Sequence, residues 1–412
     1  MPDNDHADVT DRVSLVFSDW SPLGHVEDPL HKDLSAVARI GNCLFVACDE
    51  TASVERLRHL DDGNFGDHRH FALAGLVALP AGPNGEMDIE GLCAEGGFLW
   101  IVGSHALKRS KPKREENDPG AALKRMEIVR EPNRYFFGRV PLVEEERGLF
   151  APARAVDRRQ AAWVKFGRSR SALVRWVSDD PHLGAFLQMP SKENGFDVEG
   201  LAVRGSRAWL GLRDPVLRGH AVVLDMELAE KAPGRLKARR IDGGRRYRKH
   251  LLDTRGLGIR DMRLDGDDLL LLVGPSMGLE GPAFVLRWCG AVHDDASGVI
   301  DPARIETLCE LPYRLHVDHP EGLESWPEAG PGALLVIYDA PAPERTDPDR
   351  FAVFADVVRP PSRDATSRPP SSDERHPHPS SSGKRSVTRG SGAGSSALRG
   401  PRSSGRAARA QE

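Results

Sequence analysis

The chain has 412 residues, of which 39% are hydrophobic, and it carries 57 basic and 61 acidic side chains. It opens on a polar, acidic stretch instead of a basic segment followed by an apolar one, so we expect no signal peptide. No apolar run approaches the ~18–20 residues that a membrane helix needs, and we expect a soluble, cytoplasmic protein.

The first predicted strand is the apolar run Val13–Phe17, after which a five-residue motif begins to recur. The motif reads DIEGL at residues 88–92, DVEGL at 197–201 and, altered, HPEGL at 319–323. Two weaker copies fit the same frame at residues 33–37 and 258–262. The five copies lie 55, 109, 61 and 61 residues apart, so three of the four intervals are close to one repeat unit.

A short apolar run bounded by turn residues follows each copy, at residues 43–49, 98–104, 208–214, 269–276 and 333–339. Most units add a second run, at residues 134–140, 221–225, 283–288 and 351–358. Runs of this length between turn residues predict strands and not helices. One strand-rich unit cannot bury both of its faces alone, so neighbouring units must stack around an axis.

These features predict an all-β protein, a β-propeller of about five four-stranded blades over residues 12–358. The one long interval holds either a degenerate sixth blade or insertions. We favour insertions, namely a charged loop at about 106–124 and a short helical segment at about 169–183, where Ser169 or Ser171 can cap the helix. Because an open ring leaves exposed strand edges, we expect Val13–Phe17 to pair beside Phe351–Val358 and complete the last blade.

The composition changes at about Pro360, where Ser, Pro, Gly and Arg replace almost all apolar residues. Residues 359–412 carry 11 basic and 4 acidic side chains, whereas the remainder carries 46 and 57. Such a segment buries too little surface to offset the entropy of ordering, so we predict a disordered tail, and a flexible N-terminus over residues 1–11. We favour a solubilising role for the tail over weak binding of nucleic acid or an acidic partner.

Several of these segments together resemble the bacterial domain-of-unknown-function family 3616: the motifs at 88–92, 197–201 and 319–323, the segment Trp100–His105, and Gly274-Pro275-Ser276 ahead of residues 281–284. The resemblance covers roughly residues 12–358. It implies a propeller-like fold and no established activity. The Glu-Gly-Leu signature is also similar to that of phytase-like esterase propellers, which supplies an analogy only.

In a propeller, the start of the first strand of each blade and the end of the second lie on one face, around the mouth of the channel. The candidates for ligand or metal binding there are Asp88, Glu90, Asp197, Glu199, Asp214, His319 and Glu321. The three glutamates share one repeat position, which Arg260 takes in the fourth unit. Converging carboxylates recruit a cation or raise one another's pKa, and oxygen ligands favour Ca²⁺ or Mg²⁺. Ion pairs with arginine, or turns closed on backbone N–H groups, would satisfy the same carboxylates without a metal.

Two functions follow from this pattern, and whether the chain is an enzyme stays open. The first is the binding of a small polar ligand or a protein at the channel mouth. The alternative is a divalent-metal-dependent phosphoesterase or esterase-like hydrolase, with His105 as the base and Arg213 or Arg260 on an anionic group. The sequence contains neither a P-loop nor a Rossmann pattern, so it does not predict a nucleotide cofactor. Pairing of the three glutamates with Arg213 or Arg260 would favour the binding function.

Overall fold

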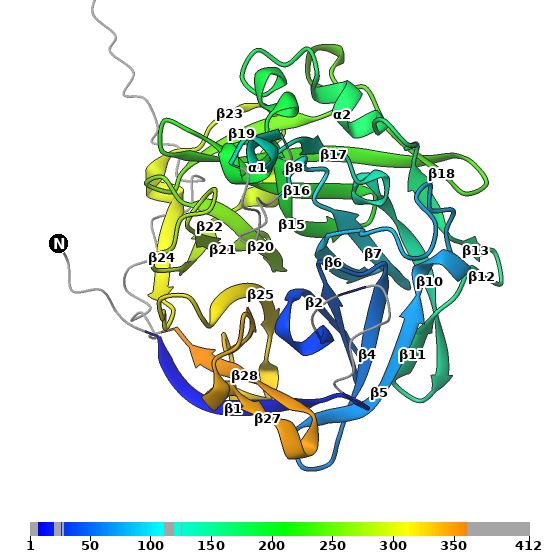
Figure 1. The fold of residues 1–412 in the computed structure, drawn as a ribbon, viewed down its shortest axis with the longest axis vertical. Helices are drawn as coiled ribbons and strands as arrows, with labels where there is room; N and C mark the ends of the chain where they lie inside the picture. The colour runs from blue at the N-terminus through cyan, green and yellow to red at the C-terminus, as the bar shows by residue number, and fades with distance from the viewer. Residues whose placement is uncertain (1–6, 20–25, 27–28, 111–118, 125, 361–412) are drawn as a thin grey trace, which may run out of the picture. The chain divides into compact units, whose positions relative to one another are not determined.

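The computed structural model describes residues 7–19, 26, 29–110, 119–124 and 126–360, so nearly all of the predicted tail lies outside the described residues. The described part is mostly β, with α-helices only at α1 (Pro119–Lys124) and α2 (Ala172–Val177) (Figure 1). Neither is long or apolar enough to cross a membrane. The Ser171 side chain accepts a hydrogen bond from the Val174 N–H, and this cap confirms the helix expected within residues 169–183.

One sheet joins strands from both ends of the described chain. Its order is β2 (Leu34–Ile40), β3 (Cys43–Cys48), β4 (Ser53–His59), β5 (Phe65–Ala72), β1 (Asp8–Val16), β28 (Ala352–Arg359), β26 (Leu334–Asp339) and β25 (His319–Ser325), with β27 (Thr346–Asp347) beside β28. β1 runs antiparallel to β28, with Val13 opposite Ala355 and Leu15 opposite Val353. The expected pairing of the N-terminal strand with the last repeat is therefore confirmed, and this strand already begins at Asp8.

A second sheet contains the strands of the two units that carry the strongest motif copies. Its order is β15 (Asp197–Arg204), β16 (Arg207–Leu217), β17 (His220–Ala232), β18 (Arg235–Ala238), β14 (Ala162–Val164), β10 (Phe137–Glu146), β7 (Phe98–Gly103) and β6 (Ile89–Glu95). Three further strands extend it, β11 (Leu149–Pro152) beside β10, β19 (Arg248–Asp253) beside β17, and β23 (Gly298–Val299) beside β19. The strand expected over 134–140 begins only at Phe137, because Pro132–Tyr135 forms a 3-10 turn.

A four-stranded sheet follows in the chain, in the order β20 (Gly258–Asp265), β21 (Asp268–Gly274), β22 (Phe284–Trp288) and β24 (Ile305–Glu310). Two short pairs complete the described strands, β8 (Lys108–Arg109) with β9 (Ile128–Val129) and β12 (Ala155–Val156) with β13 (Arg159–Gln160).

The five motif copies lie on β2, β6, β15, β20 and β25, and these strands are neighbours in a closed cycle. β2 contacts β6, β6 contacts β15, β15 contacts β20, β20 contacts β25, and β25 contacts β2 again. Figure 1 shows these five strands around the centre of the fold, with the other strands of each sheet further out. The arrangement is β-propeller-like, and it brings the same motif position of five units to one central region.

The glycine of the motif allows the innermost strands to approach each other. A Cβ atom on Gly91 would lie 2.7 Å from the Cβ of Leu201, and one on Gly200 would lie 2.8 Å from the Cγ of Met262. Leu201 and Met262 are the leucine positions of the next motif copies along the cycle. A side chain at the glycine would therefore force adjacent strands apart, which explains why Glu-Gly-Leu recurs as a unit.

A buried arginine ties four of the innermost strands together. From β20, Arg263 donates Nη1–H to the Leu92 carbonyl of β6 at 2.8 Å and Nη2–H to the Val37 carbonyl of β2. Its Nε lies 3.2 Å from Oε2 of Glu324 on β25. The side chain is only 7% exposed. These contacts hold β2, β6, β20 and β25 in place relative to one another, close to the motif glutamates.

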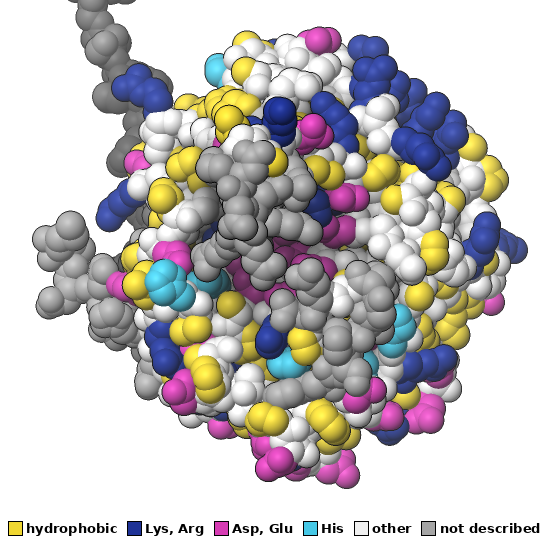
Figure 2. All heavy atoms as spheres, in the orientation of Figure 1, with side chains coloured by type: hydrophobic (Ala, Val, Ile, Leu, Met, Phe, Trp, Pro, Cys, Tyr) yellow, Lys and Arg dark blue, Asp and Glu magenta, His cyan; other side chains and the backbone are white. Residues whose placement is uncertain are grey.

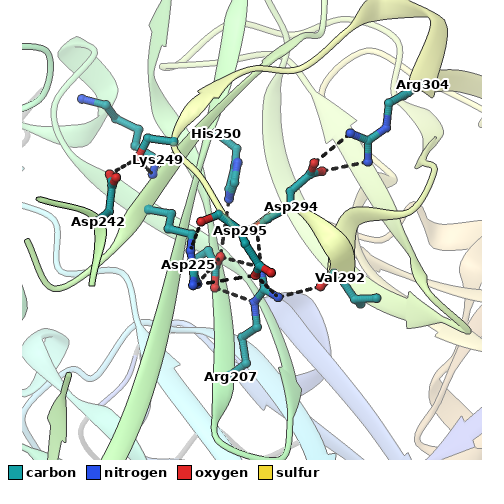
Figure 3. A network of polar contacts seen from close by, with 11 residues as sticks. Arg207, Asp225, Asp242, Lys249, His250, Val292, Asp294, Asp295 and Arg304 are labelled. Atoms are coloured by element: carbon teal, nitrogen blue, oxygen red, sulfur yellow. Dashed lines mark hydrogen bonds and ion pairs between the residues drawn. The ribbon is translucent and has the colours of Figure 1, made fainter. Parts of the chain in front are cut away.

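A second buried network holds the outer strands of the second sheet against the unit that follows (Figure 3). Fully buried Asp225 on β17 accepts two hydrogen bonds from Arg207, at 2.9 and 2.7 Å, and one from Arg248 at 3.1 Å. Arg207 also bonds the backbone carbonyl of Asp294, whose carboxylate accepts two hydrogen bonds from Arg304, both at 2.8 Å. Arg207, Arg248 and Arg304 are therefore paired with carboxylates inside the protein.

Candidate functional site

The middle residue of every motif copy lies in a β-bulge. The pairing of each innermost strand with the next shifts by one residue at this position, and the bulged residues are Ser35, Glu90, Glu199, Arg260 and Glu321. A bulge inserts an unpaired residue and re-aims its side chain, which is why bulges are common next to binding sites. All five of these side chains line one cavity.

This cavity, which we call the mouth cavity, has a volume of about 640 Å³ and an acidic wall. Twelve acidic side chains line it against six basic ones. Figure 2 shows Asp and Glu side chains in the hollow at the centre of this face. The structure brings eight of the ten candidate residues into its wall, namely Asp88, Glu90, Asp197, Glu199, Arg213, Arg260, His319 and Glu321.

Two of the three motif glutamates are paired with arginine. Arg213 donates Nη1–H to Oε1 of Glu199 at 2.8 Å. Arg260 donates Nη1–H to Glu321, and the same nitrogen lies 3.6 Å from Oε2 of Glu199. Arginines of the third and fourth units therefore neutralise two of the three motif glutamates.

Asp88 has a partner that the sequence did not reveal. Arg134, in the 3-10 turn before β10, places Nη1 at 2.8 Å from Oδ2 of Asp88 and donates Nε–H to Glu86 at 3.0 Å. Lys108 forms a second ion pair with Glu86. These three partners lie outside the repeated motif, so its periodicity carried no signal for them.

Glu90 differs from the other motif glutamates. Among the described residues it makes no hydrogen bond or ion pair. Asp197 lies beside it in the wall, with a buried Oδ1 that has no hydrogen-bond partner. Burial, reinforced by nearby carboxylates, raises the pKa of Glu90, Asp197 and Asp49 well above their usual range. Arg213 partly offsets the charge of Asp197, whereas Glu90 has no ion pair with a described cation.

The other two candidate residues do not line the mouth cavity. His105 lies in the wall of a second cavity of about 390 Å³, where its Nδ1 bonds the Gly103 carbonyl and burial lowers its pKa to about 4. Asp214 is fully buried, accepts a hydrogen bond from the Met277 N–H, and has its pKa raised by burial to about 6. The imidazole expected to act as a base is thus not grouped with the three glutamates.

Within the described part of the chain, no three His, Cys, Asp or Glu side chains converge in a way that could hold a metal ion. The pairing with Arg213 and Arg260 explains this for Glu199 and Glu321. The three carboxylates expected to bind Ca²⁺ or Mg²⁺ all line the mouth cavity, but those of Glu199 and Glu321 already have guanidinium partners.

We expect the protein to lose stability as the pH rises from about 6.5 to about 8, because burial raises the pKa of Asp261 and of Glu321 to about 7 and that of Glu90 well above its usual range. The folded state holds the proton of Glu90 more tightly than the unfolded chain does, because its pKa is raised. A carboxyl of this kind contributes stability below its unfolded pKa and loses it as the pH rises toward its folded pKa. By about pH 7.5, His105 is neutral in the unfolded chain as well as in the folded one and no longer opposes this trend.

Thermal unfolding at the two pH values measures the effect. Glu90→Gln should melt higher than the wild type at the upper pH and show a smaller drop, because Gln carries no charge to bury. The exposed control Glu146→Gln should behave as the wild type. A melting temperature that rises with pH over this interval would show that these carboxyls are not perturbed.

A family model described as protein of unknown function (DUF3616) matches residues 33–356, which include all five motif copies. The chain belongs to this family. No curated protein matches the chain. The family description carries no activity, so the function has to be argued from the mouth cavity itself.

Solved structures resemble the chain only distantly. The PQQ-bound aldose sugar dehydrogenase from Streptomyces coelicolor is 10% identical, with a TM-score of 0.36 over 84% of this chain and 98% of that one. An exo-β-1,3-galactanase from Phanerochaete chrysosporium is 9% identical, with a TM-score of 0.37 over 85% and 64%. A DUF4623 protein from Bacteroides eggerthii is 9% identical, with a TM-score of 0.33 over 87% and 76%. The chain spans less than two thirds of the galactanase, and none of these likenesses bears on its ligand.

Proposed function

We propose that the chain is a five-bladed propeller that binds a small, positively charged polar ligand, such as an amine, in the mouth cavity. The blade number follows from one blade for each innermost strand, with β1 closing the last blade beside β28. The motif copies at 88–92 and 197–201 then contribute two carboxylates each to the channel mouth, and the insertion at 169–183 lies between β14 and β15.

The observation that carries the proposal is the uncompensated Glu90. Its counterparts Glu199 and Glu321 are paired with arginine, whereas Glu90 faces the cavity beside Asp49 and Asp197 without a described cation. Buried carboxyls of this kind are costly to ionise unless a positive charge arrives with the ligand. An ammonium group has up to three N–H donors and matches three carboxyl acceptors.

The metal-dependent hydrolase has less support. Its base, His105, lines a different cavity, and the two arginines assigned to an anionic substrate are occupied by Glu199 and Glu321. A divalent ion at Glu90 would have to displace these pairs or use Asp49 and Asp197 alone.

Thermal unfolding with three probes separates the possibilities. Putrescine should raise the melting temperature by several degrees at saturation, because a ligand that binds only the folded state stabilises it by linkage. Neutral glucose should leave the melting temperature unchanged, and Ca²⁺ should shift it little. Glu90→Gln should abolish most of the putrescine shift, whereas Glu146→Gln should preserve it.

Two results would contradict the proposal. A shift with Ca²⁺ that is reversed by a chelator and absent for putrescine would move the assignment to a metal site. Equal putrescine shifts in the wild type and in Glu90→Gln would show that the amine binds elsewhere.

A further inference from the structure

The segment 231–249 is far more basic than the body to which it belongs. It contains nine Lys and Arg residues and a single acidic residue, Asp242, although the chain outside the tail is acidic overall. The carboxylate of Asp242 is itself bonded by the Ser297 hydroxyl. A dense run of cations without compensating acids marks a surface for a polyanion.

Two of the nine cations form buried ion pairs within the fold. Arg248 is paired with Asp225, and Lys249 donates to Asp180 at 2.5 Å. The cations of β18 and the residues after it behave differently. Arg235, Lys237, Arg239 and Arg240 are exposed, and no described residue forms an ion pair with them.

Neighbouring elements add cations to the same side. β14 runs parallel to β18, with Trp163 opposite Arg235, and the Arg246 guanidinium lies over the Trp176 ring of α2 at 5.7 Å. Arg246 also donates to the carbonyl of Ala238, the last residue of β18, so α2 and the end of β18 contact the same side chain. The basic face consists of Arg170, Arg175, Arg235, Lys237, Arg239 and Arg240, all of them exposed. Figure 2 shows Lys and Arg side chains gathered on the side where α2 and β18 lie in Figure 1.

The composition and spacing of the basic face favour phosphate. Five of its six residues are arginines, whose planar guanidinium groups bind phosphate oxygens bidentately. Arg235 and Lys237 alternate with buried Leu236 and Ala238, so both point outward from β18. Their Cα atoms are about 7 Å apart, a separation that a chain of phosphodiesters can follow.

The second cavity extends the basic face and has no acidic residue in its wall. Arg170 and Arg175 line it together with buried Tyr135, Phe196 and His105. Because His105 donates its Nδ1–H to the Gly103 carbonyl, its buried Nε2 is an acceptor, and this atom has no hydrogen-bond partner among the described residues. Aromatic walls and an unused acceptor suit a nucleobase with an exocyclic amino group, because the flat ring can lie against an aromatic side chain while the amino group donates to Nε2.

We propose that the basic face binds the phosphodiester backbone of a nucleic-acid strand, with the second cavity beside it receiving a base. The affinity then comes mainly from phosphate contacts and is strongly salt-dependent. The site is independent of the mouth cavity and of its ligand.

The test uses the full-length chain and a fluorescein-labelled single strand of about 20 nucleotides, with binding followed by anisotropy between about 50 and 200 mM salt. The fourfold variant Arg235→Glu, Lys237→Glu, Arg239→Glu, Arg240→Glu should weaken binding at least about tenfold at the lower salt and flatten the salt slope. The matched control, Arg147→Glu with Arg350→Glu, changes exposed arginines away from the face and should bind nearly as the wild type.

Duplex DNA and poly-L-glutamate form the comparison arms. Weaker binding of the duplex is expected, since its stacked bases cannot enter the second cavity. Tighter binding of poly-L-glutamate than of the single strand would overturn the assignment in favour of an acidic protein partner. Equal affinities of the wild type and the folded fourfold variant would overturn it as well, because residues outside the basic face would then carry the binding.

Discussion

Deletion of residues 1–18 should prevent the chain from forming a stable monomer. β1 pairs with β28 along its length and buries Val13, Leu15 and Phe17, which are 4%, 0% and 3% exposed. Each of these side chains stabilises the fold by about 1.5–3 kcal/mol, and together they approach the whole stability of a typical domain. The deletion would also leave the edge of β28 open to other chains.

Size-exclusion chromatography and thermal unfolding measure this outcome. The matched control removes residues 363–412, which lie outside the described residues and beyond the last strand, and should melt with the cooperativity and temperature of the full-length chain. A soluble, monomeric 19–412 protein with an unchanged melting temperature would contradict the closure by β1.

Replacement of Arg263 by alanine should cost about 3–5 kcal/mol, the usual penalty for breaking a buried charged contact. The change removes the donors to the Leu92 and Val37 carbonyls and leaves the Glu324 carboxylate without its guanidinium partner. Arg263→Lys should recover only part of the loss, because one ammonium group cannot replace the three-way fork. Denaturant unfolding gives the free-energy change directly.

Arg204→Ala is the matched control for this change. Arg204 is 43% exposed and pairs with exposed Asp267, so its loss should cost less than about 1 kcal/mol. If Arg263→Ala were no more destabilising than Arg204→Ala, the innermost strands would not depend on Arg263.

The repeated motif allowed much of the fold to be predicted from the sequence. Because Glu-Gly-Leu recurs where adjacent strands approach, it predicted the innermost strands and the shared position of Glu90, Glu199 and Glu321. The apolar run at Val13–Phe17 needed a partner, and this predicted its pairing beside β28. Both predictions were possible because the recurring motif and the apolar run are short, continuous stretches of sequence that each form part of a strand.

Other features depend on contacts between segments that are distant in the sequence, and no repeated pattern in the sequence indicates them. Arg134 reaches Asp88 from a 3-10 turn, and Arg263 reaches carbonyls of two other units, so only the three-dimensional arrangement reveals them. His105 follows a strand at the expected place, yet it lines the second cavity. The total charge of the body did not indicate the basic face, because a local excess of cations is hidden when charge is summed over the whole acidic body.

Calorimetric titration of putrescine into the full-length chain at about pH 7 tests the central claim most directly. In two buffers of different ionisation enthalpy, the difference in heat reports protons released on binding. Saturable binding is predicted, and because the arriving ammonium lowers the raised pKa of Glu90, protons should be released over the pH range in which the free carboxyl titrates. Glu90→Gln should bind at least about tenfold more weakly and release fewer protons. Equal affinity and proton release in the two proteins, or the absence of saturable binding to the wild type, would contradict the account.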